Sequence, residues 1–214
     1  MHRPTRRYLT ACRAIHLNQP VTLDEVTAAR SAPASASPVR FGTILFLSSE
    51  LLLFGGLFAS YFGLRSRTTP WPPEGATPDV ALAAFGTGLL MVSSLCLARG
   101  LAHAAKKGNL AGLRRWTLVT MALGLGFLAM EAWDWMHVDF SISSHPYGTM
   151  YYTLTGIHGL HVLAGLLVLV VLLTRSYQGA YDTGRLDGAH AMAYYWQFCD
   201  ATWVLIFLVV FVLR

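Results

Sequence analysis

Six ionisable side chains interrupt long apolar runs of this sequence, and their chemistry has to be explained first. They are Glu50, Glu131, Asp134, His158, His161 and Asp200. If these runs cross a membrane, a charged group at mid-depth costs roughly 2.5 to 3.5 kcal/mol on insertion scales, so such groups are paired or functional. The residue types allow metal ligation, proton transfer or hydrogen bonding between helices.

The histidine pair allows two interpretations. His158 and His161 are separated by three positions, which places them about 60° apart on a helix, so both can face a bundle interior. They could ligate haem or copper, or they could hydrogen-bond to Glu131, Asp200 or a hydroxyl group. Haem takes axial ligands from both of its faces, typically from different helices, and the other histidines lie in the tail or near helix ends. The sequence therefore favours hydrogen-bonded imidazoles and no metal site on this chain.

The acids also have two possible roles. Glu50 and Glu131 could carry protons or could fasten helices together, and the absence of a traceable relay favours fastening. Asp200 lies between Trp196 and Trp203, either of which could shield it and offer an indole N–H. We expect one interhelical polar network and no catalytic residue. Its expected members are Glu50, Glu131, His158, His161 and Asp200.

Composition gives the class of protein. The hydrophobic share is 54% and the charged share 13%, about half the charged share of a soluble domain. Five runs can cross a hydrocarbon core of roughly 30 Å as helices of about 20 residues. They cover residues 41–64, 80–102, 116–137, 150–173 and 191–213. The predicted fold is all-α: a polytopic bundle of five transmembrane helices within residues 39–214.

Basic residues predict the orientation of the bundle. Thirteen of the 16 Lys and Arg residues lie in the N-terminal segment, between the second and third runs or at their ends, or between the fourth and fifth runs. The positive-inside rule places these segments, and so the N-terminus, in the cytoplasm and the C-terminus outside. The net charge of +5 follows from this asymmetry and does not indicate nucleic-acid binding.

Two segments outside the runs have recognisable compositions. Residues 1–38 contain no apolar core of a signal sequence and end in a Pro/Ser/Ala-rich stretch, which predicts a cytoplasmic tail and linker. The loop 65–79 contains Trp71 within Pro-Trp-Pro-Pro, which favours an extended hairpin with Trp71 as an interfacial anchor. Three distant cysteines form no metal or disulfide framework.

Taken in order, these segments resemble subunit III of the haem–copper oxidase family, in its short five-helix bacterial form. The first run contributes Ser48-Ser49-Glu50-Leu51, Phe54 and Phe58-Ala59-Ser60-Tyr61-Phe62, and the third contributes Gly126-Phe127 and Glu131. The fourth contributes Thr155-Gly156-x-His158-Gly159-Leu160-His161-Val162-x-x-Gly165, and the fifth Tyr195-Trp196-x-Phe198-x-Asp200-x-x-Trp203. Gln197 stands where the family usually has His.

The resemblance implies an accessory subunit of a proton-pumping terminal oxidase of the bacterial plasma membrane. Such a subunit holds no redox centre, packs on subunit I beside subunit II, binds phospholipid, supports proton uptake and protects turnover. Haem and copper are then expected in the partner subunits, and a cytochrome bc complex is a further possible partner. Trp71, Tyr195, Trp196 and Trp203 are expected to pack against lipid or subunits.

Other functions remain open at this point. Within the family they are a quinol oxidase subunit III and a nitric oxide reductase accessory protein. Outside it they are a small proton-coupled transporter that uses Glu50 and the histidine pair, and a b-type cytochrome with His158 and His161 as haem ligands. Flux through liposomes and an optical spectrum of the isolated chain distinguish the last two.

Overall fold

Five long helices form the chain wherever the structure, a computed structural model, describes it, namely over residues 38–76, 78–181 and 186–213. They are α3 (Pro38–Arg65), α4 (Val80–Lys107), α5 (Leu110–His137), α6 (Pro146–Tyr177) and α7 (Asp187–Ile206), which continues into the π-helical segment η1 (Phe207–Val212). All five are long and apolar enough to cross a membrane. The predicted all-helical, multi-span architecture is confirmed. The predicted tail lies outside the described residues except for Pro38.

The helices extend beyond the predicted apolar runs. A helix of 28 residues, such as α3, is about 42 Å long at 1.5 Å per residue, which exceeds the hydrocarbon thickness. Pro38 is the first residue of α3 and not the last of a linker, because proline fits the first turn of a helix. The ends of α3 therefore project past the hydrocarbon core of the membrane, and hydropathy alone does not predict where the helix begins and ends.

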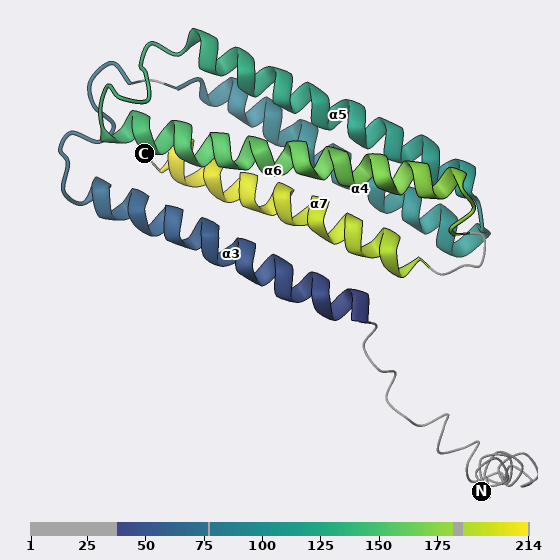
Figure 1. Cartoon of the computed structure of the whole chain (residues 1–214). Coiled ribbons are helices and arrows are strands. Elements are labelled where there is room, and N and C mark those ends of the chain that lie inside the picture. Colours follow the sequence, from purple (N-terminus) through teal and green to yellow (C-terminus); the bar gives the residue numbers. More distant parts are fainter. Residues whose placement is uncertain (1–37, 77, 182–185, 214) are drawn as a thin grey trace, which may run out of the picture. The chain divides into compact units, whose positions relative to one another are not determined.

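Local capping explains two of the tight connections. Gly108 ends α4 with φ +59°, a left-handed conformation that glycine adopts without steric cost, and Asn109 then accepts a hydrogen bond from the Gly112 N–H to begin α5. At α6, His145 Nδ1 accepts from the Gly148 N–H at 2.8 Å. Short connections keep α4 and α5 antiparallel neighbours (Figure 1).

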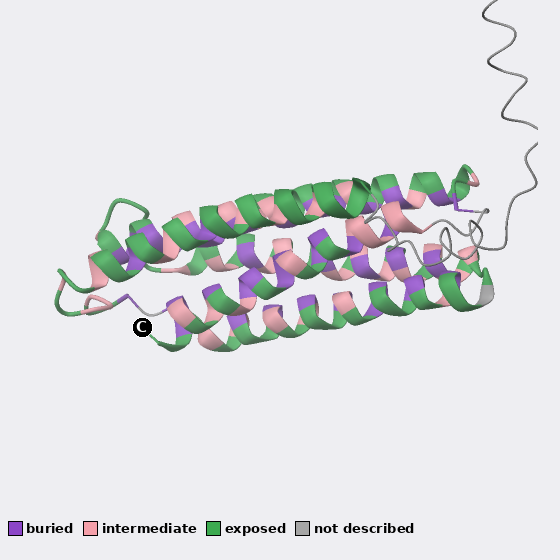
Figure 2. Ribbon diagram, turned by 90° about the horizontal axis from the view of Figure 1, so that it is seen from below, coloured by how far each residue is buried: buried purple, intermediate pink, exposed green. Residues whose placement is uncertain are grey.

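Helix α7 organises the bundle because it packs against α3, α4 and α6, while α5 packs against α4 and α6 (Figure 1). Buried residues follow the faces on which helices meet, and exposed residues cover the outside (Figure 2). Many of the exposed residues of the spans are large and apolar, as expected of a surface that faces lipid.

Trp196 of α7 fills the centre of this packing. A Cβ atom on Gly124 of α5 would lie 2.6 Å from Trp196 Cη2, and one on Gly165 of α6 would lie 3.0 Å from Trp196 Cε3. The indole N–H donates to Ser93 Oγ of α4 at 2.9 Å. Two glycines and one serine therefore let a single tryptophan join four helices.

Helix α3 is attached more sparsely, and only Phe54 and Tyr61 of its residues are buried. The Tyr61 hydroxyl donates to the Val209 carbonyl at 3.1 Å and accepts from Trp71 Nε1 at 3.0 Å. Val209 lies in η1, near a helix end, where carbonyl groups lack partners within the helix. The tyrosine satisfies one of these groups and fixes the C-terminal half of α3.

Trp71, which the sequence predicts as an interfacial anchor, also packs within the chain. Its ring is half-buried and packs edge-on against Tyr61 and Tyr147, at centroid distances of 5.3 and 5.4 Å. The loop also forms turns and no extended hairpin over residues 66–76 and 78–79. The prolines were interpreted correctly as helix breakers, but the hydrogen bond to Tyr61 draws the indole inward.

Candidate polar sites within the membrane

Glu50 and His161 form an ionisable pair across α3 and α6. Glu50 Oε2 lies 2.9 Å from His161 Nε2, and His161 Nδ1 lies 2.7 Å from the Ile157 carbonyl oxygen. Because that carbonyl can only accept, Nδ1 carries a hydrogen. A second hydrogen must then lie between Nε2 and Oε2, either on a protonated Glu50 or on an imidazolium beside a carboxylate. The overall neutral pair holds one exchangeable proton.

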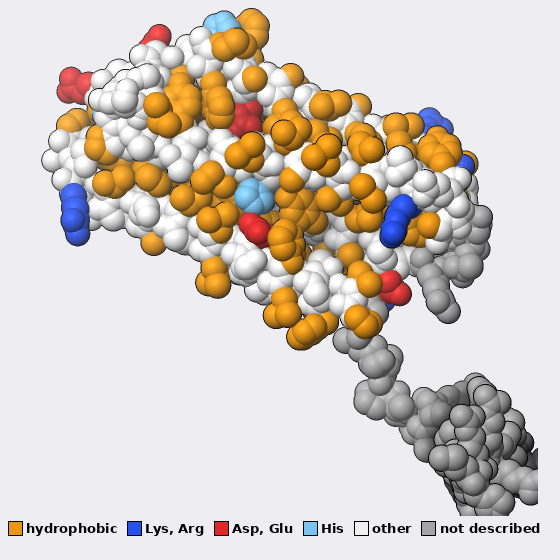
Figure 3. All heavy atoms as spheres, in the orientation of Figure 1, with side chains coloured by type: hydrophobic (Ala, Val, Ile, Leu, Met, Phe, Trp, Pro, Cys, Tyr) orange, Lys and Arg blue, Asp and Glu red, His pale blue; other side chains and the backbone are white. Residues whose placement is uncertain are grey.

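The surroundings leave this pair partly open. The side chains of His161 and Glu50 are 16% and 18% exposed, near the middle of α6 and α3. The Phe54 ring meets the imidazole edge-on at 5.0 Å, and the Tyr195 hydroxyl donates to the His161 carbonyl at 3.1 Å. Figure 3 shows a histidine and acidic side chains within an otherwise hydrophobic face. Both ring nitrogens of His161 are already engaged and are not available to a metal.

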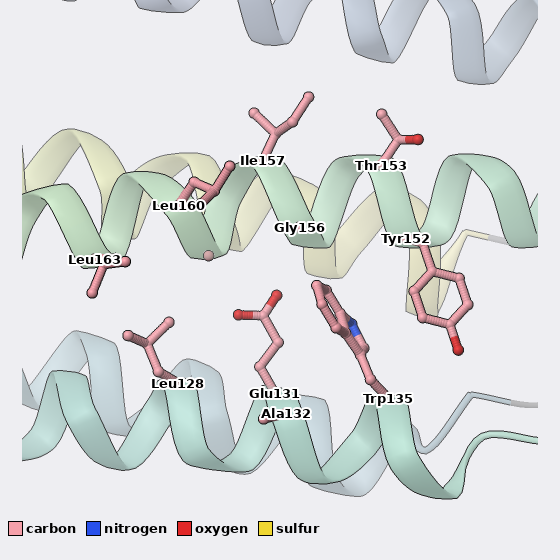
Figure 4. A pocket seen from close by; sticks show the side chains of 11 residues that line it. Leu128, Glu131, Ala132, Trp135, Tyr152, Thr153, Gly156, Ile157, Leu160 and Leu163 are labelled. Atoms are coloured by element: carbon pink, nitrogen blue, oxygen red, sulfur yellow. The ribbon is translucent and has the colours of Figure 1, made fainter. Parts of the chain in front are cut away.

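Glu131 lies in a separate groove between α5 and α6. The groove has a volume of about 510 Å³ and apolar walls, and the Glu131 carboxyl group points from α5 towards α6 beside Trp135 (Figure 4). Glu131 is 6% exposed, and its Oε1 atom has no hydrogen-bond partner within the described residues. A Cβ atom on Gly159 would lie 2.8 Å from Oε2, so this glycine makes room for the carboxyl group.

His158 is enclosed by aromatic rings. It is 0% exposed, and neither ring nitrogen has a hydrogen-bond partner among the described residues. Phe127 meets it edge-on at 5.7 Å and Trp203 lies over it at 5.0 Å.

Asp200 faces a second groove, between α4 and α7. It is 8% exposed, and neither carboxylate oxygen has a hydrogen-bond partner in the described part of the chain. The expected indole donors are directed elsewhere, since Trp196 donates to Ser93 and Trp203 donates to Thr87 at 3.0 Å. The shared helix face was interpreted correctly, but both N–H groups reach across to α4.

The single polar network expected from the sequence does not form. Of its five members, only Glu50 and His161 hydrogen-bond to one another, and Glu131, His158 and Asp200 occupy three different environments. Residue spacing predicts which residues share one face of a helix, but it does not predict which other helix that face contacts. Tyr195, Trp196 and Trp203 pack within the chain, where they join α7 to α6 or α4.

Sequence reasoning also missed two contacts between α5 and α6. The Tyr151 hydroxyl donates to Asp134, and Trp135 Nε1 donates to Thr155 Oγ1 at 3.2 Å. These four residues lie near the ends of consecutive antiparallel runs. Pairing the residues at equal distances from the short connection between the runs could have identified both contacts.

No cluster of three or more His, Cys, Asp or Glu side chains lies close enough to hold a metal ion in the part of the chain that the structure describes. A third groove, of about 520 Å³, lies at the cytoplasmic end predicted for α3 and is lined by α3, α6 and α7. Its walls include Phe46, Ala164 and Tyr195, and it runs along the same helices as the Glu50–His161 pair.

Five membrane-spanning helices with paired and unpaired polar groups at mid-depth define a polytopic α-helical membrane protein. A family model described as cytochrome c oxidase subunit III matches residues 18–213. The chain belongs to the cytochrome c oxidase subunit III family.

Several curated proteins are similar over most of the chain. A probable cytochrome c oxidase subunit 3 of Nocardia farcinica is 39% identical over 180 residues, which cover 82% of this chain and 88% of the relative. The protein of the same description in Mycobacterium tuberculosis is 37% identical over the same shares. A cytochrome c oxidase subunit 3 of Synechocystis is 38% identical over 176 residues, 81% of this chain and 75% of the relative. The chain is thus a multi-pass bacterial membrane protein of the oxidase subunit III type.

Proposed function

We propose that this chain is an accessory subunit of a proton-pumping cytochrome c oxidase and carries no redox centre itself. The observation that carries the proposal is the family match over residues 18–213. Haem and copper belong to the partner subunits I and II, and oxygen is reduced there. This chain packs on subunit I in the plasma membrane, with its N-terminus in the cytoplasm as the distribution of basic residues indicates.

We further propose that phospholipid chains occupy the grooves beside α6. The two grooves of about 510 and 520 Å³ fall within the usual range of ligand sites, and their walls are mainly apolar. One runs along α5 and α6 and the other along α3, α6 and α7. An acyl chain in the second groove would keep helix α3, which buries few residues, against the bundle during turnover.

The Glu50–His161 pair is the proposed proton-related site of the chain. Its shared proton can move between oxygen and nitrogen without any change in the net charge of the pair. The pair is partly exposed on α3 and α6, so a group of a neighbouring subunit can reach it. It would thereby support proton uptake by the catalytic subunit while holding α3 in place.

The test of the proposal is purification of the tagged chain from native membranes in a mild detergent. We expect stoichiometric haem–copper subunit I and a dicopper subunit II in the same particle. Recovery of the chain with no haem–copper subunit would refute the assignment. The particle should oxidise reduced cytochrome c faster than quinol, and the reverse preference would indicate the quinol oxidase alternative.

A further inference from the structure

The groove between α4 and α7 contains polar groups whose hydrogen bonds are incomplete. Its volume is about 350 Å³, and Ser94 of α4 with Gln197 and Asp200 of α7 are its polar residues. Asp200 is 92% buried, yet neither of its carboxylate oxygens accepts a hydrogen bond within the described residues. Ser94 is the adjacent hydroxyl, and it can satisfy at most one of the two oxygens.

Ser94 differs from the other hydroxyl groups that face lipid. The exposed serines and threonines of α3 each donate to a carbonyl group of their own helix, three or four residues earlier. They are Thr43, Ser48, Ser49 and Ser60. Ser94 Oγ makes no such bond and has no partner in the described residues, although it is shielded from solvent. Its single hydrogen can serve only one acceptor, either Asp200 or a group that enters the groove, so at least one Asp200 oxygen still lacks a donor.

Depth decides what kind of group can enter. The centre of the span Asp187–Val212 falls at Asp200, and the centre of α4 falls at Ser94. With a hydrocarbon core of roughly 30 Å, lipid headgroups lie about 15 Å from this level and their donors do not reach it. An acyl chain at this depth offers no hydrogen bond. A side chain of another membrane-spanning helix can supply a donor at this depth.

We infer that this groove, whose mainly apolar walls carry the polar groups of Ser94, Gln197 and Asp200, docks a transmembrane helix of another oxidase subunit that presents a hydrogen-bond donor at mid-membrane depth. The inference rests on the proposed function for the identity of the partner. The exposed Gln197 amide supplies two donors and an acceptor beside the carboxyl group, and Ala201 leaves space for a close approach. The Glu50–His161 pair lies at the same depth but satisfies itself, so its helices do not need such a partner.

The first experiment maps the neighbour of the groove in the intact complex. A photo-crosslinking amino acid is placed at Leu95, which lines the groove and is 59% exposed, and at Leu52 of α3, which is 77% exposed and does not line the groove. We expect the probe at Leu95 to crosslink to a helix of another subunit. The probe at Leu52 should not crosslink to that helix. Adducts from Leu95 with lipid alone, or with a second copy of this chain, would overturn the inference.

The second experiment changes the polar groups. Asp200→Leu should increase the fraction of this chain released from the complex about tenfold at a fixed detergent concentration, whereas Asp200→Asn should release little because it keeps hydrogen-bonding capacity. Ser94→Ala should act in the same direction as Asp200→Leu, and Ser49→Ala is the matched control because its hydroxyl bonds only to its own helix. Equal release from all four variants would contradict the inference. The two experiments also separate the inference from the proposed function. If the purified particle contains subunit I but the probe at Leu95 crosslinks to no helix of another subunit, the docking surface is wrong and the proposed function stands. If the particle contains no oxidase subunit, the proposed function itself is wrong.

Discussion

Replacing Glu50 and His161 by leucine, singly and together, should reveal a coupling energy of about 1 to 2 kcal/mol. The 2.9 Å contact joins two groups with at least one shared proton, and hydrogen bonds to charged groups contribute about 1.5 to 3 kcal/mol when buried. The side chains are 16% and 18% exposed, and polar contacts between membrane helices average about 0.6 kcal/mol with a maximum near 1.7. Partial exposure and the small measured contacts both indicate that the coupling energy lies towards the lower end of the range of about 1.5 to 3 kcal/mol, or below it.

Each single replacement leaves the other group without its partner, whereas the double replacement leaves an apolar contact. Glu50→Leu or His161→Leu alone should therefore cost about 1 to 3 kcal/mol, and the double variant should cost less than their sum. Glu50→Gln should cost less than Glu50→Leu, because an amide N–H can donate to Nε2.

The assay is reversible unfolding of the purified chain or complex in mixed micelles, followed by helix content. Leu52→Ala serves as the control, since Leu52 is 77% exposed on the same helix and its truncation creates no cavity. It should change the free energy of unfolding by less than about 0.5 kcal/mol. Strict additivity of the two leucine replacements would refute the reasoning, because it would mean that the pair contributes no interaction energy.

Two further predictions concern the packing of the bundle. Gly124→Ala should destabilise the chain by about 1 to 3 kcal/mol, because its methyl group would lie 2.6 Å from Trp196, whereas Gly126→Ala meets no atom closer than 3.9 Å and should be tolerated; equal thermal stabilities of the two variants would contradict this account. Tyr61→Phe should cost about 1 to 3 kcal/mol in the same unfolding assay, because it removes the donor to the Val209 carbonyl and the acceptor for Trp71, and an unchanged stability would show that these bonds contribute nothing.

The fold was predictable because its main determinant is local. An apolar run of about 20 residues must be helical in lipid, whatever its neighbours are, so all five spans were found. Their ends were placed too far inward at Arg65, Lys107 and Pro146, where capping and helix geometry extend the helices beyond the apolar core. Composition carries no signal for such extensions.

The site was only partly predictable because it depends on which helices meet. Glu50 and His161 were identified as informative residues, but their contact spans 111 positions and was not assigned. His161 was expected to bond to Glu131, Asp200 or a hydroxyl group, since these share its depth. The arrangement of α3 beside α6, rather than depth, selects the partner.

The indole donors illustrate the same limit. Trp196 and Trp203 share a helix face with Asp200, so the sequence favoured N–H groups directed at the acid. Their rings extend across the interface and donate to Ser93 and Thr87 of α4. A side chain of this length reaches the next helix, and the period of its own helix does not predict that partner.

The account is tested most directly by comparing the oxidase with and without this chain. The chain is dissociated selectively from the purified complex, and haem and copper content, the optical spectrum and the time course of cytochrome c oxidation are measured. We expect unchanged haem and copper per subunit I and a near-normal initial rate, followed by faster loss of activity during turnover. Loss of haem or copper together with the chain, or a haem spectrum in the isolated chain, would contradict the assignment of an accessory subunit without a redox centre.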